Sequence, residues 1–312
     1  MMLTHKSNLN DKTLRVPLEV TFVHSLNTFL GNRFKKNFEP IRKTKFIREK
    51  QHTSWRVGRL VRASISQIRI VLVEPEGADN VGSVSRVMRN FNFSKLILVN
   101  PKCNYMEGRA RAMRGIDVLT NCKVVMSLAE ALNGCTRVVA STSRQRDSCA
   151  DLVLEDPRSV LSWLTHSGFG STAAIVFGRE SSGLTNDELK LAHRFLKIPA
   201  SEEYPVLNLA MAVGIVCYEL YISSTETAVG NLNLRTTKAS SEANFETKES
   251  LYKRLENLLL SISFISEQSK KKRMMRFRSM LNRLNMSTKE ANMLHGVISH
   301  VEQTWKPKKS SD

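Results

Sequence analysis

Three stretches of the chain place polar or charged side chains directly after apolar runs, where a binding site could form. The first contains Asn80, Gly82 and Arg86 in the spacing N-x-G-x-x-x-R. A guanidinium near the start of a helix suits a phosphate group, and a glycine lets another group approach the backbone closely. We interpret Asn80 as a helix N-cap and Arg86, close to two turns later, as a phosphate ligand on roughly the same face. An ordinary cap and a surface arginine are the alternative.

The second stretch is FGRESSGL, in which two glycines bracket Glu180. It lacks the Gly-Lys-Ser/Thr of a P-loop, and G-x-G-x-x-G occurs nowhere in the chain, so neither an ATP site nor a dinucleotide site is indicated. The third stretch is a loop that leads through Tyr204 and Pro205 to Asn208, the first polar side chain of an apolar helix. A glycine-requiring turn and a capped core helix are the structural alternatives for these two stretches.

The elements that must position these residues alternate along the chain. Short apolar, β-branched runs predict buried strands at residues 68–73, 95–100, 124–126, 137–140, 173–177 and 195–198. Apolar residues at helical spacing predict helices at residues 80–93, 128–132, 186–193 and 207–221. This alternation implies a mostly parallel α/β sheet covered on both faces. The three stretches follow strands, at the edge where such sheets bind ligands.

A second, helical region is expected after this sheet. Residues 222–246 are rich in Ser, Thr, Asn and Ala, which predicts a flexible linker, and amphipathic helices are expected at residues 249–262, 270–284 and 287–303. The last opens with Ser287 and Glu290 in a capping-box spacing. The predicted organisation is a basic, flexible or targeting extension at 1–66, an α/β domain at 67–222, a linker at 223–246, a helical domain at 247–304 and a basic tail at 305–312.

The net charge of +18 is concentrated at the two ends of the chain. Residues 1–66 hold 14 Lys and Arg against 4 Asp and Glu, residues 247–312 hold 14 against 6, and the middle holds 19 against 19. Basic flanks attract polyanions, so nucleic acid is the expected partner; a solvated basic protein is the alternative. The densest basic helix face, which we expect to contact RNA unless it is merely solvated, consists of Lys270, Lys271, Lys272, Arg273, Arg276 and Arg278.

Composition excludes several classes of protein. The five cysteines are scattered without a C-x-x-C pair, which argues against a disulfide framework and a zinc site, so no metal is expected. No apolar run approaches the roughly 20 residues that span a bilayer, so no membrane association is expected. The first 66 residues lack the apolar segment of a secretory signal. We expect a cytoplasmic protein, or an organellar one if this extension is a transit peptide.

Taken together, the three stretches resemble the three motifs of the SPOUT-class RNA 2′-O-methyltransferases, and they are most similar to the TrmJ-type subfamily. NVGSVSRVMRNF resembles the first motif, VFGRESSGLTNDEL the second and EYPVLNLAMAVGIVCYE the third. The likeness continues through LYKRLENLLLSISFI and ANMLHGVISHVEQ. It covers about residues 67–304 and leaves residues 1–66 unaccounted for.

This resemblance implies a fold and an activity. The fold is a SPOUT α/β fold, with a mostly parallel sheet and a C-terminal trefoil knot, followed by a small helical domain and assembled as a homodimer. The activity is transfer of a methyl group from S-adenosylmethionine to a ribose 2′-hydroxyl of tRNA, in this subfamily at the pyrimidine of anticodon-loop position 32. The alternatives are an rRNA 2′-O-methyltransferase of the same class and a SPOUT-like module that binds RNA without catalysis.

The resemblance also implies residue roles. The catalytic set is Arg86, Asn80, Asn208 and Glu180. The cofactor-binding set is Phe177, Gly178, Glu180, Gly183, Ile198, Leu207 and Asn208. Because a guanidinium stays protonated, we expect Arg86 to hold a backbone phosphate and orient the hydroxyl, while phosphate or water takes the proton. The family commonly has Ser where this chain has Val206, so one hydroxyl that could orient the ribose or Arg86 is missing.

Overall fold

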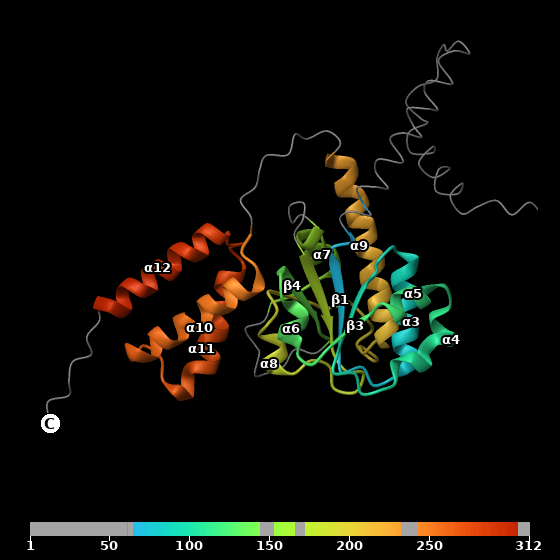
Figure 1. Cartoon of the computed structure of the whole chain (residues 1–312), viewed down its shortest axis with the longest axis horizontal. Coiled ribbons are helices and arrows are strands. Elements are labelled where there is room, and N and C mark those ends of the chain that lie inside the picture. Colours follow the sequence, from blue (N-terminus) through green and yellow to red (C-terminus); the bar gives the residue numbers. More distant parts are fainter. Residues whose placement is uncertain (1–60, 62–64, 144–152, 166–171, 232–241, 305–312) are drawn as a thin grey trace, which may run out of the picture. The chain divides into compact units, whose positions relative to one another are not determined.

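The computed structural model describes residues 61, 65–143, 153–165, 172–231 and 242–304 (Figure 1). Almost all of the basic extension expected at 1–66 lies outside these residues, as do the tail at 305–312 and much of the expected linker.

Seven parallel strands form one sheet in the order β3-β2-β1-β6-β4-β7-β5. The strands are β1 (Ile68–Val73), β2 (Lys95–Val99), β3 (Lys123–Val125), β4 (Cys135–Ser141), β5 (Leu154–Glu155), β6 (Thr172–Phe177) and β7 (Arg194–Leu196). Every pairing between these strands is parallel, which confirms the predicted α/β class. The two-residue strand β5 was not predicted, because so short a segment carries no period.

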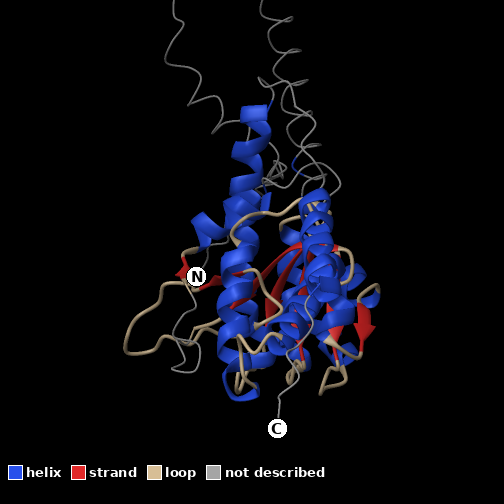
Figure 2. Ribbon diagram, turned by 90° about the vertical axis from the view of Figure 1, so that its left-hand side faces the viewer, coloured by secondary structure: helices blue, strands red, loops and turns tan. Residues whose placement is uncertain are grey.

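Helices cover both faces of this sheet (Figure 2). They are α3 (Ala78–Asn90), α4 (Arg109–Ala112), α5 (Ile116–Thr120), α6 (Leu128–Leu132), α7 (Pro157–Thr165), α8 (Asn186–Leu189) and α9 (Leu209–Asn231), with 3-10 turns η2 (Tyr105–Gly108) and η3 (Met113–Gly115). The sequence did not predict α7 or the helical turns between β2 and β3. Helix α9 continues to Asn231, into the segment expected to be a linker.

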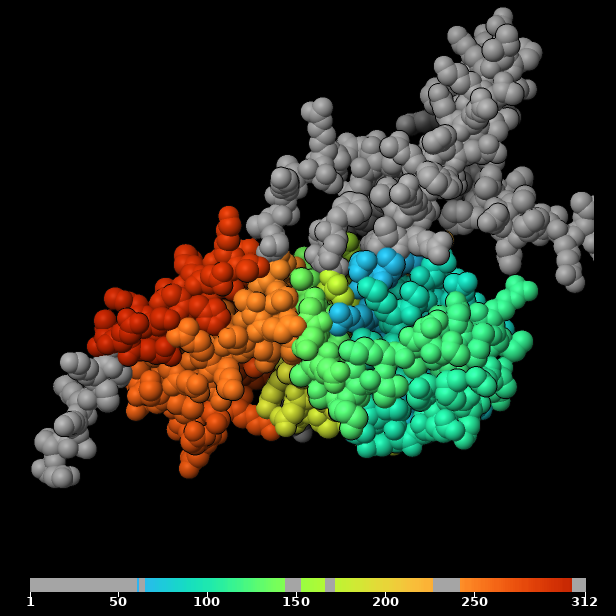
Figure 3. Space-filling view, in the orientation of Figure 1, coloured from blue at the N-terminus to red at the C-terminus, as the bar shows by residue number. Residues whose placement is uncertain are grey.

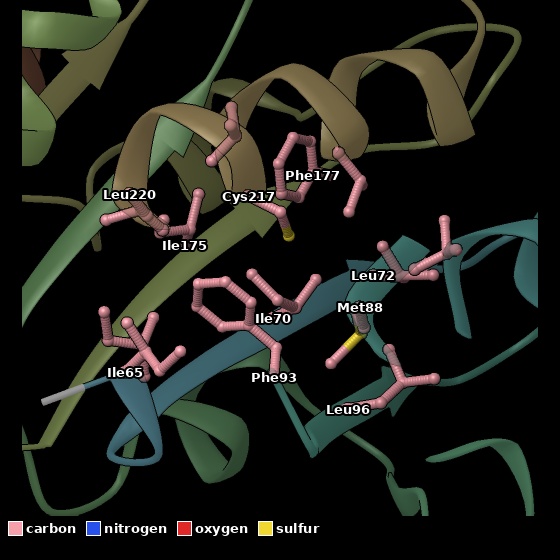
Figure 4. Close-up of a cluster of buried hydrophobic side chains, with 14 of the residues drawn as sticks. Ile65, Ile70, Leu72, Met88, Phe93, Leu96, Ile175, Phe177, Cys217 and Leu220 are labelled. Carbon is pink, nitrogen blue, oxygen red and sulfur yellow. The ribbon is translucent and has the colours of Figure 1, made fainter. Parts of the chain in front are cut away.

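The core consists of two apolar layers, one on each face of the sheet. In β1, Ile70 and Leu72 belong to the layer that contains α3 and α9, whereas Val71 and Val73 belong to the layer that contains α6 and α8. This alternation follows from the two-residue period of a strand. Figure 4 shows the first layer, where Phe93 of the turn after α3 lies among strand and helix side chains. Because the central strands are buried on both faces, they appear in the sequence as continuous apolar runs.

Three further helices form the C-terminal region, namely α10 (Phe245–Ser261), α11 (Glu267–Asn282) and α12 (Thr288–Thr304). They enclose an apolar cluster of their own, to which Leu251 and Ile298 belong. The predicted capping box is confirmed. The Glu290 carboxylate accepts hydrogen bonds from both the backbone N–H and the hydroxyl of Ser287 at 2.7 Å, and Ser287 Oγ accepts from Glu290 N at 3.3 Å.

A buried ionic cluster joins this region to the sheet. Glu242 accepts hydrogen bonds from Arg137 Nε of β4 at 2.8 Å and from Lys248 Nζ of α10 at 3.2 Å. Lys248 also donates to the carbonyl of Thr136 at 2.9 Å. Burial lowers the pKa of Lys248, and the nearby Glu242 carboxylate opposes that shift. The cluster satisfies each buried charge, which is the condition for burying charges without a large penalty.

His193, next to this cluster, makes folding stability depend on pH. It is buried, and its Nδ1 accepts the backbone N–H of Val138 at 2.9 Å. Burial, together with the charges of Lys248 and Arg278, lowers the pKa of His193 well below its ordinary value of 6.5. Below pH 6.5 this histidine therefore binds a proton in the unfolded chain but not in the folded chain. Its contribution to the unfolding free energy is fully present above pH 6.5 and declines as the pH falls.

We predict that this titration accounts for a loss of unfolding free energy on the order of 1 kcal/mol between pH 7.5 and pH 5.5. His193→Asn retains an acceptor for the Val138 N–H but cannot be protonated, so its stability should fall less over this range. Urea denaturation at several pH values measures the difference. Parallel pH profiles for the two proteins would contradict the prediction.

Candidate active site

A single carboxylate, Glu180, joins the loop after β6 to the start of α3. Glu180 Oε1 accepts hydrogen bonds from the backbone N–H of Gly77 at 3.2 Å and from Asn80 Nδ2 at 2.9 Å. Glu180 Oε2 accepts the backbone N–H of Glu76 at 2.9 Å. Three donors on one carboxylate fix the position of this loop, so the geometry fits a role for Glu180 in holding it.

The third motif meets the other two through Asn208. Its Nδ2 donates to Asn80 Oδ1 at 2.9 Å, while its Oδ1 accepts the backbone N–H of Ala210 at 2.9 Å. Asn208 therefore caps α9 and connects that helix to α3. The structure thus brings Asn80, Glu180 and Asn208, which lie far apart in the sequence, into one hydrogen-bonded chain.

The expected N-cap role of Asn80 is wrong. Helix α3 begins at Ala78 with Gly77 at the N-cap, so Asn80 lies in the first turn. From there its side-chain amide reaches both Glu180 and Asn208. The cap position would have turned the amide back onto the backbone N–H groups of its own helix.

Arg86 lies apart from this cluster. Its side chain is exposed and forms no hydrogen bond or ion pair with the residues that the structure describes. Six residues of α-helix rotate by about 600°, which leaves Asn80 and Arg86 about 120° apart around α3. The two side chains therefore do not share a face, and the expectation that they would is wrong.

A pocket of about 140 Å³ opens beside the cluster, at the carboxyl ends of β4, β6 and β7. Six of the predicted cofactor-binding residues line it, namely Phe177, Gly178, Glu180, Gly183, Ile198 and Leu207. Asn208 is not among the lining residues. Sequence reasoning missed Ser141, Thr142 and Ser143, which also line it. Nothing in the sequence shows that β4 is the neighbour of β6, and only that adjacency places these residues here.

The wall of this pocket requires glycine at two positions. A Cβ atom on Gly178 would lie 2.2 Å from the carbonyl carbon of Gly183, so the loop crosses itself backbone to backbone. Gly183 has a φ of +71°, in the left-handed region that favours glycine. At these two positions the pocket is bordered by main-chain atoms without a side chain.

Arg179, between Gly178 and Glu180, anchors the loop from its other side. It donates to Glu74 at 2.8 Å through Nε, and its Nη1 and Nη2 donate to the two oxygens of Glu188 at 3.0 and 2.9 Å. The hydrogen bond from Arg179 is the main cause of the lowered pKa of Glu74. Burial raises the pKa of Glu188, but hydrogen bonds from Arg179 and Thr185 outweigh it and the net shift is downward.

The basic helix face predicted to contact RNA is partly occupied by pairs within the chain. Lys270 pairs with Glu267 at 2.8 Å, Lys271 with Asp187 at 3.4 Å, and Arg278 with Glu249. Arg273 donates to the carbonyl of Phe264 at 2.7 Å. The Arg276 side chain is not free of partners either. In the described part of the chain, Lys272 is the one member of the set without a hydrogen bond or ion pair.

The described residues offer neither a metal site nor a membrane span. No group of three or more His, Cys, Asp or Glu side chains in the described ranges is arranged to hold a metal ion. No helix within those ranges combines the length and apolar character needed to cross a bilayer.

Two family models match the chain. The SpoU rRNA methylase family matches residues 67–218, and the C-terminal domain of tRNA methyltransferase TrmJ matches residues 246–310. The sheet with its covering helices and the C-terminal helical region therefore each match a family of RNA-modifying enzymes.

Full-length relatives match as well. The chain is 36% identical over 245 residues to the tRNA (cytidine/uridine-2′-O-)-methyltransferase TrmJ of Pectobacterium atrosepticum, covering 77% of this chain and 98% of that one. It is also 36% identical to the protein of the same name from Salmonella typhimurium, covering 78% and 100%. Among solved structures, TrmJ from Z. mobilis ZM4 superposes with a TM-score of 0.63 at 26% identity, covering 75% and 98%.

We predict that Arg179→Leu lowers the unfolding free energy by about 2 kcal/mol at pH 7, because it leaves the half-buried carboxylates of Glu74 and Glu188 without a partner. The loss should shrink below about pH 4.5, where these carboxyls take up protons. Arg158→Leu is the control. Its guanidinium is 85% exposed in a 3.5 Å pair with Glu219, so it should cost less than about 1 kcal/mol. Equal losses in a denaturant titration would refute the anchoring role.

Proposed function

Because the chain belongs to the TrmJ family of tRNA (cytidine/uridine-2′-O-)-methyltransferases, we propose that it transfers the methyl group of S-adenosylmethionine to a ribose 2′-hydroxyl of tRNA. The observation that carries the proposal is the meeting of Asn80, Glu180 and Asn208 beside the pocket. The target nucleotide is the pyrimidine at anticodon-loop position 32, as the resemblance to the subfamily implies. The location is cytoplasmic, or organellar if residues 1–66 are a transit peptide.

The residues that line the pocket suit this cofactor. Phe177, Ile198 and Leu207 provide apolar walls for a planar base, and the main chain around Gly178 and Gly183 provides polar groups for its edges. When bound, S-adenosylmethionine supplies a methyl group already activated by the positive sulfur. The trefoil knot that family membership implies for this region stays a prediction.

The protein must then align a weak nucleophile. Methyl transfer forms a bond between the ribose 2′-oxygen and the methyl carbon while the bond from that carbon to sulfur breaks. The proton of the 2′-hydroxyl must leave as well. Arg86 holds a backbone phosphate and orients the hydroxyl, with the phosphate or water receiving the proton. Asn80 and Asn208 orient the ribose, and Glu180 holds the loop after β6 against the start of α3. Val206 contributes no hydroxyl to this alignment.

We also propose that the enzyme is a homodimer, with α9 at the interface. Met211, Ile215, Tyr218 and Ile222 are 63%, 38%, 50% and 37% exposed on this helix. Their spacing of four, three and four residues places them on one face. An exposed apolar stripe of this kind is typical of a protein interface. A second copy would also give the outward-pointing Arg86 a site near or across the interface at which to act.

Helix α11 remains part of the proposed RNA surface. Lys272 offers a free charge, and the exposed pair of Lys271 with Asp187 is weak enough to exchange for phosphate. Lys270 is more firmly held, because it lies between Glu267 and Glu256. Arg278 is held more firmly. Its side chain is 18% exposed, and its guanidinium lies over the ring of Tyr252. We therefore assign Arg278 to the packing of α10 against α11.

The central test is a methyl-transfer assay with labelled S-adenosylmethionine and unmodified tRNA transcripts, followed by mapping of the labelled nucleotide. We expect label at the 2′-oxygen of position 32. Arg86→Ala should lower kcat at least about 100-fold at saturating tRNA and cofactor. Arg89→Ala, a change on the same helix at a side chain that is 51% exposed, should retain activity.

Three other outcomes of this assay would contradict parts of the proposal. Near wild-type turnover by Arg86→Ala would remove that residue from the mechanism. Label on ribosomal RNA but not on tRNA would indicate an rRNA enzyme of the same class. Absence of both methyl transfer and cofactor binding, with RNA binding retained, would indicate a non-catalytic RNA-binding module.

The interface has its own test. Sedimentation should give the wild type twice its chain mass of 35.3 kDa. Met211→Glu with Tyr218→Glu should give a monomer, because two carboxylates cannot be buried unpaired in an apolar interface. The control changes Met293 and Val297 to Glu on α12, where the two side chains are 64% and 55% exposed, and should leave the dimer intact. A monomeric wild type would overturn the proposed assembly.

A further inference from the structure

Three arginines form an exposed surface on the short segment that follows β2. They are Arg109 and Arg111 of α4 and Arg114 of η3, which we call the arginine platform. Figure 1 shows α4 beside α3, and in Figure 3 the same part of the chain lies at the surface on the right. No period in the sequence marks this segment, so its pattern alone does not predict a binding surface.

The platform is fixed against α3 by direct backbone contact. A Cβ atom on Gly82 would lie 2.0 Å from the carbonyl oxygen of Gly108, the residue before Arg109. A Cβ atom on Gly115, the residue after Arg114, would lie 2.7 Å from the Cα of Arg86. The glycine of the first motif therefore accommodates the protein's own backbone. These contacts hold the platform beside the helix that carries Asn80 and Arg86.

The positive charge of this surface is largely uncompensated. Within the described residues, neither Arg109 nor Arg114 has a hydrogen bond or ion pair, and the same is true of Arg86. Arg111 pairs with Asp79 at 3.4 Å, but the two side chains are 64% and 69% exposed, so the pair is weak.

Two further acids lie close in sequence to the platform, and neither forms an ion pair with its arginines. Asp117 pairs with Arg89 at 3.5 Å, and Glu107 accepts a hydrogen bond from Asn104 at 3.0 Å. Within the described residues, the only ion pair of the platform is therefore the exposed one between Arg111 and Asp79. This surface therefore presents more free guanidinium groups than α11, the helix on which the sequence concentrates its basic residues.

We propose that the arginine platform binds the phosphate backbone of the RNA substrate and guides it to Arg86. The inference rests on the proposed function and adds a second RNA contact surface to it. Guanidinium groups suit phosphate oxygens because their planar donors match two acceptors at once. The glycine contacts fix the main chain that carries these side chains, so RNA binding would have to order the arginine side chains but not the backbone.

The test compares two double charge reversals with the same change in net charge. The first is Arg109→Glu with Arg114→Glu. The matched control is Lys253→Glu with Lys289→Glu, two exposed lysines of α10 and α12 for which the described residues offer no ion pair or hydrogen bond. The affinity for an unmodified tRNA transcript is measured at several salt concentrations. Titration calorimetry with S-adenosylmethionine and sedimentation follow for each protein.

We expect the platform variant to bind tRNA roughly tenfold or more weakly. The slope of its salt dependence should be smaller by about one unit for each phosphate that it no longer binds. Its affinity for S-adenosylmethionine and its oligomeric state should match the wild type. The control variant should retain much more of its affinity for tRNA.

Three results would overturn the inference. Wild-type tRNA affinity in the platform variant, with methyl transfer by the wild type intact, removes the platform and leaves the proposed function standing. An altered oligomeric state with unchanged tRNA affinity makes the surface a protein contact. If the wild type neither binds nor methylates tRNA, the proposed function fails, and the platform proposal fails with it.

Discussion

The candidate site depends on the three hydrogen bonds accepted by the Glu180 carboxylate. They join the loop after β6 to the residues before α3, and Asn80 passes the connection on to Asn208 at the start of α9. Each participant is half-buried or close to solvent, so the geometry rests on charge-assisted bonding and not on apolar packing. One of the three donors, the backbone N–H of Gly77, belongs to the N-cap of α3 and has no partner within the helix. The same bonds therefore stabilise the start of α3 and shape one side of the pocket.

Backbone contacts set the rest of the geometry. The loop of the second motif crosses itself at Gly178 and Gly183, and the first motif admits a neighbouring turn at Gly82. At both places two segments of the main chain lie closer together than a side chain between them would permit. Arg179 and its two carboxylate partners then hold the loop from its other side. Glycines in these motifs, which suggest contact with a ligand when only the sequence is known, thus have a structural role here.

Much of this arrangement could be predicted from the sequence, and the failures have identifiable causes. Buried strands such as β1 and β6 show as continuous apolar runs, and the capping box at Ser287 is a local pattern. Helix α7 does carry local signals, which our prediction missed: Asp156 caps its start, and Val160, Leu161 and Leu164 lie at helical spacing. The turns around α4, in contrast, have short patterns that depend on tertiary contacts. The N-cap assignment of Asn80 failed because its side chain bonds to residues at least one hundred positions away. The basic face of α11 was visible as composition, but its pairing with Asp187 and Glu249 is a property of the fold.

The separation in sequence of these contacts also bears on how the chain folds. The bonds from Glu76 and Asn80 to Glu180 span 104 and 100 residues, and the bond from Asn208 to Asn80 spans 128. The pairing of β1 with β6 closes loops of the same length, because Ile68 pairs with Ala173 and Leu72 with Phe177. The site bonds and the centre of the sheet therefore carry the same entropic cost of loop closure. Helices α3 and α9 can each begin from local interactions, whereas the pocket cannot. The binding site is therefore tied to the central pairing of the sheet, and a change that weakens β1 against β6 should weaken the pocket with it.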